Sequence, residues 1–314
     1  MMDFVFIASG LILLVFAGDA LVRGAVALSL KLGISALVVS LTVVAFGTSA
    51  PELLVAIKAT SQGATGIVYG NVVGSNIANV LLVLGIPALI APIVTGQDGG
   101  RRNFLMMLAS SMLFIAVCSY GGLTFHVGVA FLLLLIALLY DTYHLARKTG
   151  AENTDEVESD AVNDSTWKVA GLIAAGVIGL PLGAHFLIDG ARNVALSFGL
   201  SEAVIGLTLV AIGTSLPELA TTVMAAIRRQ SDVAVGNVIG SNMFNILAVM
   251  GVASFFGDLP TPPGFMDFDL WIMIAASLAL APFIFLKRDV GKIAGIAFLA
   301  AYAIYIIFAL APQM

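Results

Sequence analysis

The chain has 314 residues, of which 60% are hydrophobic and only 11% are charged, and its formal net charge is −5. These polar side chains are too few to cover a water-soluble body of this size, so the composition excludes a soluble globular protein. A single cysteine, Cys118, excludes an internal disulfide and a cysteine metal cluster.

Ten apolar stretches follow one another along the chain, most of them about 20 residues or longer with few charged side chains. A stretch of that length crosses the core of a bilayer as a helix, and the sequence does not resemble the short alternating strands of an outer-membrane barrel. It therefore predicts an all-α integral membrane protein with ten transmembrane helices. We expect them at roughly 4–29, 35–58, 66–93, 103–120, 123–146, 168–196, 202–227, 233–256, 268–286 and 291–311.

The segment between the fifth and sixth expected helices, residues 148–167, is polar and acidic. It separates two halves of five helices each, 1–147 and 168–314, and we interpret it as a solvated linker. A regulatory cation site in this segment would need a defined ligand geometry that the run of acidic residues does not show.

The basic residues indicate how the chain crosses the membrane. With the ten expected helices, all 14 Lys and Arg residues except Lys58 and Arg192 fall on one side. Cytoplasmic loops are enriched in Lys and Arg, so we expect the acidic linker in the cytoplasm and both termini outside it, in the inner (plasma) membrane of the cell. Near helix ends, Asp19 with Arg23 and Asp189 with Arg192 are predicted ion pairs.

Two blocks of sequence occur twice, each copy 166 residues after the first, as from Gly33 to Gly199. GISALVVSLTVVAFGTSAPEL from Gly33 matches GLSEAVIGLTLVAIGTSLPEL, and GNVVGSNIANVLLVLG from Gly70 matches GNVIGSNMFNILAVMG from Gly236. About 24 of the 53 positions in 33–85 are identical to those in 199–251. Because each copy lies in a unit with an odd number of helices, the two units are inverted relative to one another. Inverted repeats of this kind place a substrate site near the midplane, between broken helices.

Each repeat carries a polar motif, broken by proline, in an otherwise apolar helix. Pro51 and Pro217 lack an amide hydrogen and disfavour helical geometry just before them, which frees nearby backbone carbonyls. A glutamate follows each proline, and a charged side chain near the bilayer centre usually faces a partner or a pathway. The polar residues that can share helix faces in and beside these motifs are Thr48, Ser49 and Glu52, Thr214, Ser215 and Glu218, Ser75 with Asn79, and Ser241 with Asn245.

These side chains supply carboxylate, hydroxyl and amide oxygens, the hard ligands that Ca²⁺ prefers. The sequence thus predicts a cation site at the axis between the repeats. His126, His144 and His185 are dispersed outside both repeats, which argues against a soft-metal site. We expect no cofactor, and the expected partners are the transported ions and the lipid bilayer, with no nucleic acid and no protein partner that can be inferred.

Two further features of the repeated motifs have structural interpretations. Asn76 and Asn242 could bond to free backbone groups or could act as ligands themselves, and the sequence leaves both open. The GxxxG steps are expected to allow close helix packing, and their glycines are Gly70, Gly74, Gly236 and Gly240.

The paired motifs, GTSAPE with GNVVGSNIAN and GTSLPE with GNVIGSNMFN, resemble the two alpha-repeats of the cation/Ca²⁺ exchanger superfamily, most closely its prokaryotic Na⁺/Ca²⁺ exchanger branch. The resemblance implies a secondary active antiporter that exports Ca²⁺ in exchange for Na⁺ by alternating access at a shared midplane site. It also implies that the first and sixth helices, which hold Asp19 and Asp189, slide as a pair across the other helices. The cation ligands it implies are Thr48, Ser49, Glu52, Ser75, Asn79, Thr214, Ser215, Glu218, Ser241 and Asn245, with backbone carbonyls from Ala45 and Ala211.

The chain departs from the family pattern at Asn245, where well-known Na⁺/Ca²⁺ exchangers often carry Asp. Two glutamates balance one Ca²⁺, two Na⁺ or two protons, so a Ca²⁺/H⁺ antiporter that uses the same glutamates is the alternative. Against it, the matching Ca²⁺/H⁺ branch tends to carry GNxxE where this chain has GSNxxN. A cation channel is less favoured, because a midplane site in inverted broken helices is typical of a carrier. We do not expect an enzyme, since no nucleophile with its base stands out.

Overall fold

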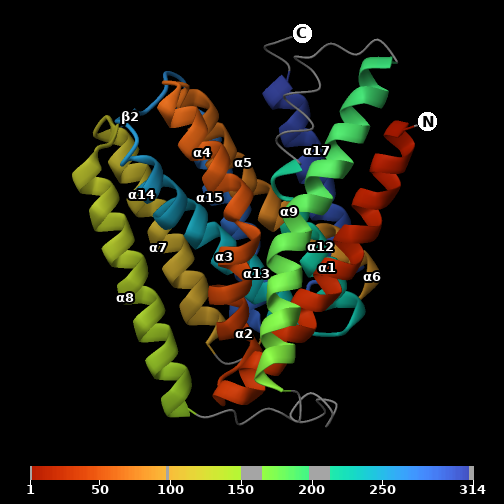
Figure 1. Ribbon diagram of the computed structural model, residues 1–314. Helices are drawn as coiled ribbons and strands as arrows, with labels where there is room; N and C mark the ends of the chain where they lie inside the picture. The colour runs from red at the N-terminus through yellow and green to blue at the C-terminus, as the bar shows by residue number, and fades with distance from the viewer. Residues whose placement is uncertain (1, 97–98, 150–164, 198–212, 311–314) are drawn as a thin grey trace.

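Long apolar helices run across most of the molecule (Figure 1). The structure, a computed structural model, describes residues 2–96, 99–149, 165–197 and 213–310. Its helices in the first half are α1 (Met2–Leu32), α2 (Ala36–Val39), the π-helix η1 (Ser40–Val44), α3 (Ala45–Thr48), α4 (Ala50–Ser61), α5 (Thr65–Leu81), α6 (Gly85–Ile90), α7 (Gly100–Ser119) and α8 (Phe125–Thr149). Those in the second half are α9 (Thr166–Ser197), α12 (Leu216–Ile227), α13 (Ser231–Phe244), the π-helix η3 (Asn245–Val249), α14 (Met250–Ala253), α15 (Asp269–Ala279), α16 (Ala281–Leu286) and α17 (Lys292–Leu310).

The described helices are those of a multi-pass membrane protein. Among the described residues, eight helices are long and apolar enough to cross a membrane, and the pair Ala36–Thr48 and Ala50–Ser61, bent by 44°, makes a ninth span. The expected helix 202–227 is described only from Gly213 onward, where α12 forms its second half. The all-α membrane class is thus confirmed, while the count of ten helices stays a prediction. Most of the acidic linker also lies outside the described residues.

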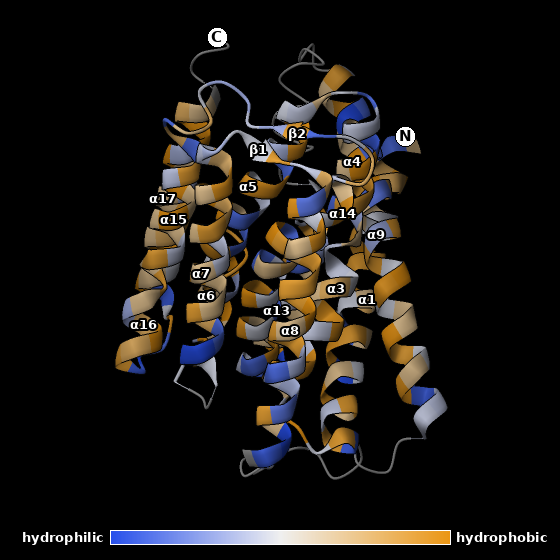
Figure 2. Ribbon diagram, turned by 90° about the vertical axis from the view of Figure 1, so that its left-hand side faces the viewer, coloured by the Kyte–Doolittle hydropathy of each residue, from blue (hydrophilic) through white to orange (hydrophobic). Residues whose placement is uncertain are grey.

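The exterior of the bundle is apolar and its interior is partly polar. Apolar residues follow the outer helices, and polar residues gather toward the two ends (Figure 2). Phe16 and Leu54 are 70% and 68% exposed, respectively, whereas Thr48 and Glu52 are fully buried. A soluble protein would rarely expose so much apolar surface, but lipid tails are a favourable surrounding for it.

α1 and α9 occupy corresponding places in the two halves and run antiparallel, in close contact (Figure 1). Small residues permit this approach: a Cβ added at Gly10 would lie 2.6 Å from the backbone nitrogen of Leu187. One added at Gly176 would lie 2.5 Å from Cβ of Leu21. Membrane helices pack this closely where glycine lines the contact. Corresponding helices that run in opposite directions are what an inverted repeat requires.

Two short β pairings lie at opposite ends of the bundle. The strands β1 (Gly122–Leu123) and β2 (Leu259–Pro260) are antiparallel, with Leu123 opposite Leu259. An isolated antiparallel bridge joins Ile93 to Val290. Figure 2 shows β1 and β2 at the top of the bundle and α16, which precedes Val290, at the bottom. Ile93 and Leu259 are matching positions of the repeat, so the two pairings follow the inversion of the halves. Neither pairing was predicted from the sequence.

The GxxxG prediction is confirmed in the second repeat. A Cβ at Gly236 would lie 2.6 Å from the carbonyl oxygen of Leu37, and one at Gly240 would lie 2.5 Å from that of Leu41. α13 therefore packs directly on the backbone of α2 and η1. The matching neighbours of Gly70 and Gly74 fall within 198–212, outside the described residues, so their packing role stays a prediction.

The predicted pair of Asp19 with Arg23 is confirmed, with 3.9 Å between Oδ2 and Nη1. The Asp19 carboxylate also accepts from Arg228 at the end of α12, a contact that the sequence did not predict. In α9, Asp189 Oδ2 lies 3.4 Å from Nε2 of His185. The predicted pair of Asp189 with Arg192 stays a prediction.

The close packing of α1 on α9 can be tested with two glycines of the same helix. Gly176→Ala places a methyl group against Leu21, and overpacking of this kind costs about 1–3 kcal/mol, so we expect a lower melting temperature in detergent. Gly171→Ala is the matched control, because a Cβ there meets no described atom within 4 Å and alanine favours the helix. Equal melting temperatures for the two variants would contradict the packing described here.

Candidate cation site

The two duplicated proline motifs interrupt their helices in the same way. α3 ends at Thr48, Ser49 is non-helical with φ −81° and ψ 6°, and α4 then begins with Pro51 in its first turn. In the second repeat Ser215 has φ −85° and ψ 4°, and α12 begins with Pro217 in its first turn. A proline is tolerated in a first turn because its missing N–H would have no helical partner there. Each break thus places its Glu at a helix N-terminus, where the helix dipole favours a negative charge.

Both glutamates are fully buried between the repeats, and each has one carboxylate oxygen held by a serine. The Ser75 hydroxyl donates to Oε1 of Glu52 over 3.3 Å, within the first repeat. The Ser49 hydroxyl donates to Oε1 of Glu218 over 3.5 Å, from the first repeat to the second. The other oxygen, Oε2, of each Glu has no hydrogen-bond partner within the described chain.

Two hydroxyl pairs cross the boundary between the repeats. Oγ1 of Thr48 lies 3.3 Å from Oγ of Ser241, and Oγ1 of Thr214 lies 3.4 Å from Oγ of Ser75. Each contact is the image of the other under the 166-residue repeat. The hydroxyls of both halves therefore meet around the carboxylates, as expected for a site on a pseudo-two-fold axis.

The expected amide ligands lie beside wide helical turns. Asn245 is the first residue of the π-helix η3. In the first repeat, the amide nitrogen of Val83 donates to the carbonyl of Ala78 over 2.9 Å, a five-residue step that begins just before Asn79. π-type turns inside helices are frequent at functional sites, because they redirect side chains. Both copies of the repeat therefore contain the asparagine and a wide helical turn beside it.

Five buried side-chain oxygens in the described part of the chain have no hydrogen-bond partner. They are Glu52 Oε2, Glu218 Oε2, Asn79 Oδ1, Asn245 Oδ1 and Ser215 Oγ. A buried polar atom without a partner costs free energy, and a charged one costs more. All five belong to the duplicated motifs, and hard oxygens of these kinds bind Ca²⁺ and similar cations. The arrangement is chemically suited to a desolvated metal cation.

Of the two backbone carbonyls expected as ligands, one already accepts hydrogen bonds and the other lies outside the described residues. The carbonyl of Ala45 accepts from the amide nitrogen of Ser49 over 3.0 Å and from the Thr48 hydroxyl over 3.4 Å. Ala211 lies outside the described residues. Among the residues that are described, no group of three or more His, Cys, Asp or Glu side chains could hold a metal ion. A cation here would thus be bound mainly by two carboxylates, hydroxyls and amides.

Sequence reasoning missed two asparagines that support the glutamates. Asn71 donates through Nδ2 to the backbone carbonyl of Glu52 over 3.1 Å, and Asn237 donates to that of Glu218 over 3.3 Å. Asn237 also donates to Thr222 over 3.0 Å and accepts from Thr48 over 3.2 Å. The signal was present, since both residues follow glycine in the duplicated GN step. The position that corresponds to Thr222 in the first repeat is Ala56, so the support is stronger in the second repeat.

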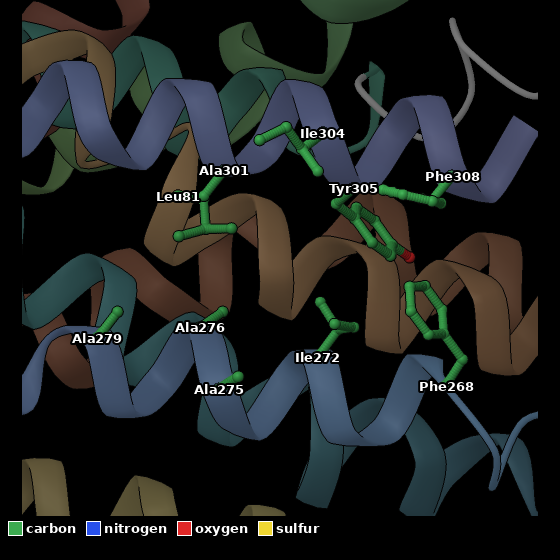
Figure 3. A pocket seen from close by; sticks show the side chains of 10 residues that line it. All are labelled: Leu81, Phe268, Ile272, Ala275, Ala276, Ala279, Ala301, Ile304, Tyr305 and Phe308. Atoms are coloured by element: carbon green, nitrogen blue, oxygen red, sulfur yellow. The ribbon is translucent and has the colours of Figure 1, made fainter.

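Elsewhere, an apolar pocket of about 340 Å³ lies between α15 and α17 (Figure 3). Apart from the hydroxyl of Tyr305, its lining side chains are apolar, with Leu81 contributed by α5. Such a lining offers almost no oxygen ligands, so the pocket is distinct in place and chemistry from the candidate cation site.

The family model described as "Sodium/calcium exchanger protein" matches residues 2–143 and 168–311. The chain belongs to the sodium/calcium exchanger family. Within that family, it is 34% identical to the "Sodium/calcium exchanger MaX1" of Methanosarcina acetivorans, with 97% of each chain covered. It is 36% identical to the "Putative antiporter CaxA" of Alkalimonas amylolytica, with 88% of each covered. A solved structure of the sodium-calcium exchanger NCX_Mj, soaked with zero Na⁺ and Ca²⁺, matches with a TM-score of 0.84 at 36% identity over 97% of each chain.

The unequal support of the two glutamates in this exchanger gives a prediction. Asn237→Ala removes three hydrogen bonds: those donated to the Glu218 carbonyl and to Thr222, and the one accepted from Thr48. Each buried polar group left unpaired costs about 1–3 kcal/mol. Asn71→Ala removes the hydrogen bond to the Glu52 carbonyl, the one bond that this side chain makes among the described residues. We expect the larger drop in melting temperature for Asn237→Ala, measured in detergent. A larger drop for Asn71→Ala would contradict the asymmetry.

Proposed function

We propose that this protein is a secondary active antiporter that exports Ca²⁺ in exchange for Na⁺ at one shared site. The observation that carries the proposal is the pair of fully buried carboxylates, Glu52 and Glu218, each with an unpartnered oxygen between two inverted repeats. The remaining proposed ligands are the hydroxyls and amides of Thr48, Ser49, Ser75, Asn79, Thr214, Ser215, Ser241 and Asn245. The carbonyls of Ala45 and Ala211 are proposed as additional ligands.

Charge balance couples the two ion fluxes. The two carboxylates carry two negative charges when ionised, which one Ca²⁺ or two Na⁺ neutralise. A neutralised site can be enclosed inside the membrane at low cost, whereas an ionised site without cations is costly to enclose. Ca²⁺ and Na⁺ at overlapping positions also exclude one another. Each ion must therefore leave on one side before the other is carried back, which is exchange.

The packing of α9 supports its role in alternating access. A Cβ at Gly47, the residue before Thr48, would lie 2.6 Å from Cγ2 of Val177 on α9. At Gly213, the residue before Thr214, it would lie 2.5 Å from Cδ1 of Ile188 on α9. α9 therefore packs over the backbone of both ligand motifs. We propose that α1 and α9, packed on each other through glycines, slide together and expose the site to one side or the other.

The proposed topology has two units of five helices, 1–147 and 168–314, joined by the linker 148–167. Arg101 and Arg102 begin α7, and Arg147 and Lys148 lie near the end of α8. In Figure 2 these ends of α7 and α8 both lie in the lower part of the bundle. A cytoplasmic location for this basic end follows from the distribution of positive charge. Both termini are then outside the cytoplasm, in the plasma membrane.

Na⁺ is favoured over H⁺ as the counter-ion because the chain has GSNxxN where the Ca²⁺/H⁺ branch tends to carry GNxxE. Three of the five unpartnered oxygens belong to Asn79, Asn245 and Ser215. Amide and hydroxyl oxygens bind a metal cation, but they do not exchange protons at physiological pH. Two protons would engage only the carboxylates, whereas Na⁺ can occupy the same amide and hydroxyl oxygens as Ca²⁺.

The proposal predicts that both glutamates are essential to transport. Glu52→Gln or Glu218→Gln keeps the side-chain volume but removes one of the two charges, so we expect loss of ⁴⁵Ca²⁺ uptake into Na⁺-loaded proteoliposomes. The matched control is Asp267→Asn, which neutralises an exposed carboxylate in the loop before α15 and should leave uptake unchanged. Melting temperatures check that the variants fold. Wild-type uptake by a folded Glu52→Gln or Glu218→Gln variant would refute the proposal.

A further inference from the structure

Asn76 and Asn242 form a closed hydrogen-bond ring across the boundary between the repeats, and two further asparagines, Asn79 and Asn245, each donate to it. Asn76 on α5 donates through Nδ2 to the backbone carbonyl of Asn242 over 3.4 Å, and Asn242 on α13 donates to that of Asn76 over 3.3 Å. Asn79 donates to Oδ1 of Asn242 over 3.0 Å, and Asn245 donates to Oδ1 of Asn76 over 3.2 Å. All four side chains are buried. Of the two interpretations left open for Asn76 and Asn242, bonding to backbone is the one observed, and the Oδ1 atom of each accepts from a proposed ligand.

The ring fixes which end of each ligand amide is free. The Nδ2 groups of Asn79 and Asn245 donate to the ring, and their Oδ1 atoms have no partner among the described residues. A rotated amide would place its NH₂ group toward the cation and its oxygen against the Oδ1 atom of Asn242 or Asn76. Both contacts are repulsive, so the ring selects the orientation that offers oxygen to a cation.

We propose that Asn76 and Asn242 are positioning residues, each of which orients the ligand asparagine of the opposite repeat. Asn76 on α5 orients Asn245 of the second repeat, and Asn242 on α13 orients Asn79 of the first. The inference rests on the proposed function, since it assigns these amides to Ca²⁺ binding. Such supporting residues typically change metal affinity by about 10–100-fold when they are removed.

The pairing distinguishes positioning from a general structural role. If Asn76 and Asn242 only tied α5 to α13, their loss would affect both ligand amides alike. In the observed arrangement, Asn76 contacts Asn245 of the second repeat, and Asn242 contacts Asn79 of the first. Each positioning asparagine therefore contacts the ligand of the opposite repeat and not the ligand three residues further along its own chain segment. Residues that act through one another give non-additive effects, whereas independent residues give additive ones.

The test is a set of double-mutant cycles on Ca²⁺ binding to the full chain, purified in detergent without Na⁺ and measured by ⁴⁵Ca²⁺ equilibrium binding. We expect Asn245→Ala and Asn76→Ala each to raise the Kd for Ca²⁺ roughly tenfold. The cross-repeat double variant Asn76→Ala/Asn245→Ala should be no weaker than Asn245→Ala alone, because Asn76 acts through that side chain. In the same-helix double variant Asn76→Ala/Asn79→Ala, the two losses should multiply.

A second, independent cycle uses the symmetric pair, with Asn242→Ala/Asn79→Ala as the coupled double variant. Asn103→Ala is the matched control, because Asn103 is a buried asparagine on α7 outside the ring, and it should leave the Kd unchanged. If an alanine variant is not monodisperse, Asn76→Ser or Asn242→Ser, which leaves a smaller cavity, replaces it in the cycle.

Multiplied losses in the cross-repeat pairs, or an unchanged Kd for folded Asn76→Ala, would overturn the positioning role while leaving the proposed function intact. Wild-type protein that neither binds nor transports Ca²⁺ would overturn the proposed function, and this assignment with it.

Discussion

The arrangement depends on two carboxylates that are held away from water inside a bundle of membrane helices. Glu52 and Glu218 are 0% exposed, and each keeps one oxygen without a hydrogen-bond partner in the described chain. Burying an ionised group is costly unless an opposite charge compensates it. Much of the surrounding architecture serves to hold these two groups in a place where a cation can supply that charge.

Inverted duplication explains how the two carboxylates come together. One repeat alone supplies one glutamate at a helix N-terminus, with a serine and an asparagine on the next helix. When the second copy is inserted in the opposite direction, the broken helices meet and their hydroxyls pair across the boundary, as Thr48 does with Ser241. The symmetry is not complete, because Thr222 supports Asn237 where the first repeat has Ala56. The two carboxylates thus sit in related but unequal surroundings, which allows ions to occupy unequal positions.

The sequence predicted the membrane class and the polar residues that the structure gathers. The membrane class follows from the composition and the long apolar stretches. The polar residues could be identified because a glutamate beside a proline in an apolar helix is costly, and its repetition makes a chance occurrence implausible. The asparagine ring and the support from Asn71 and Asn237 could not be predicted, because they depend on how side chains from opposite repeats meet in three dimensions. The bond from Arg228 to Asp19 was missed for the same reason, since 209 residues separate the two partners. Spacing along one helix identifies neighbours such as Asp19 and Arg23, but it does not report contacts between distant segments.

In the proposed exchange, a Na⁺ gradient drives Ca²⁺ through the site formed by Glu52 and Glu218. The most direct measurement is ⁴⁵Ca²⁺ uptake into proteoliposomes at clamped voltage, comparing an outward Na⁺ gradient with an outward proton gradient of equal size. We predict uptake with the Na⁺ gradient and none above the protein-free background with the proton gradient. Uptake that requires the proton gradient, or that proceeds without any counter-ion gradient when Ca²⁺ flows down its own, would contradict it.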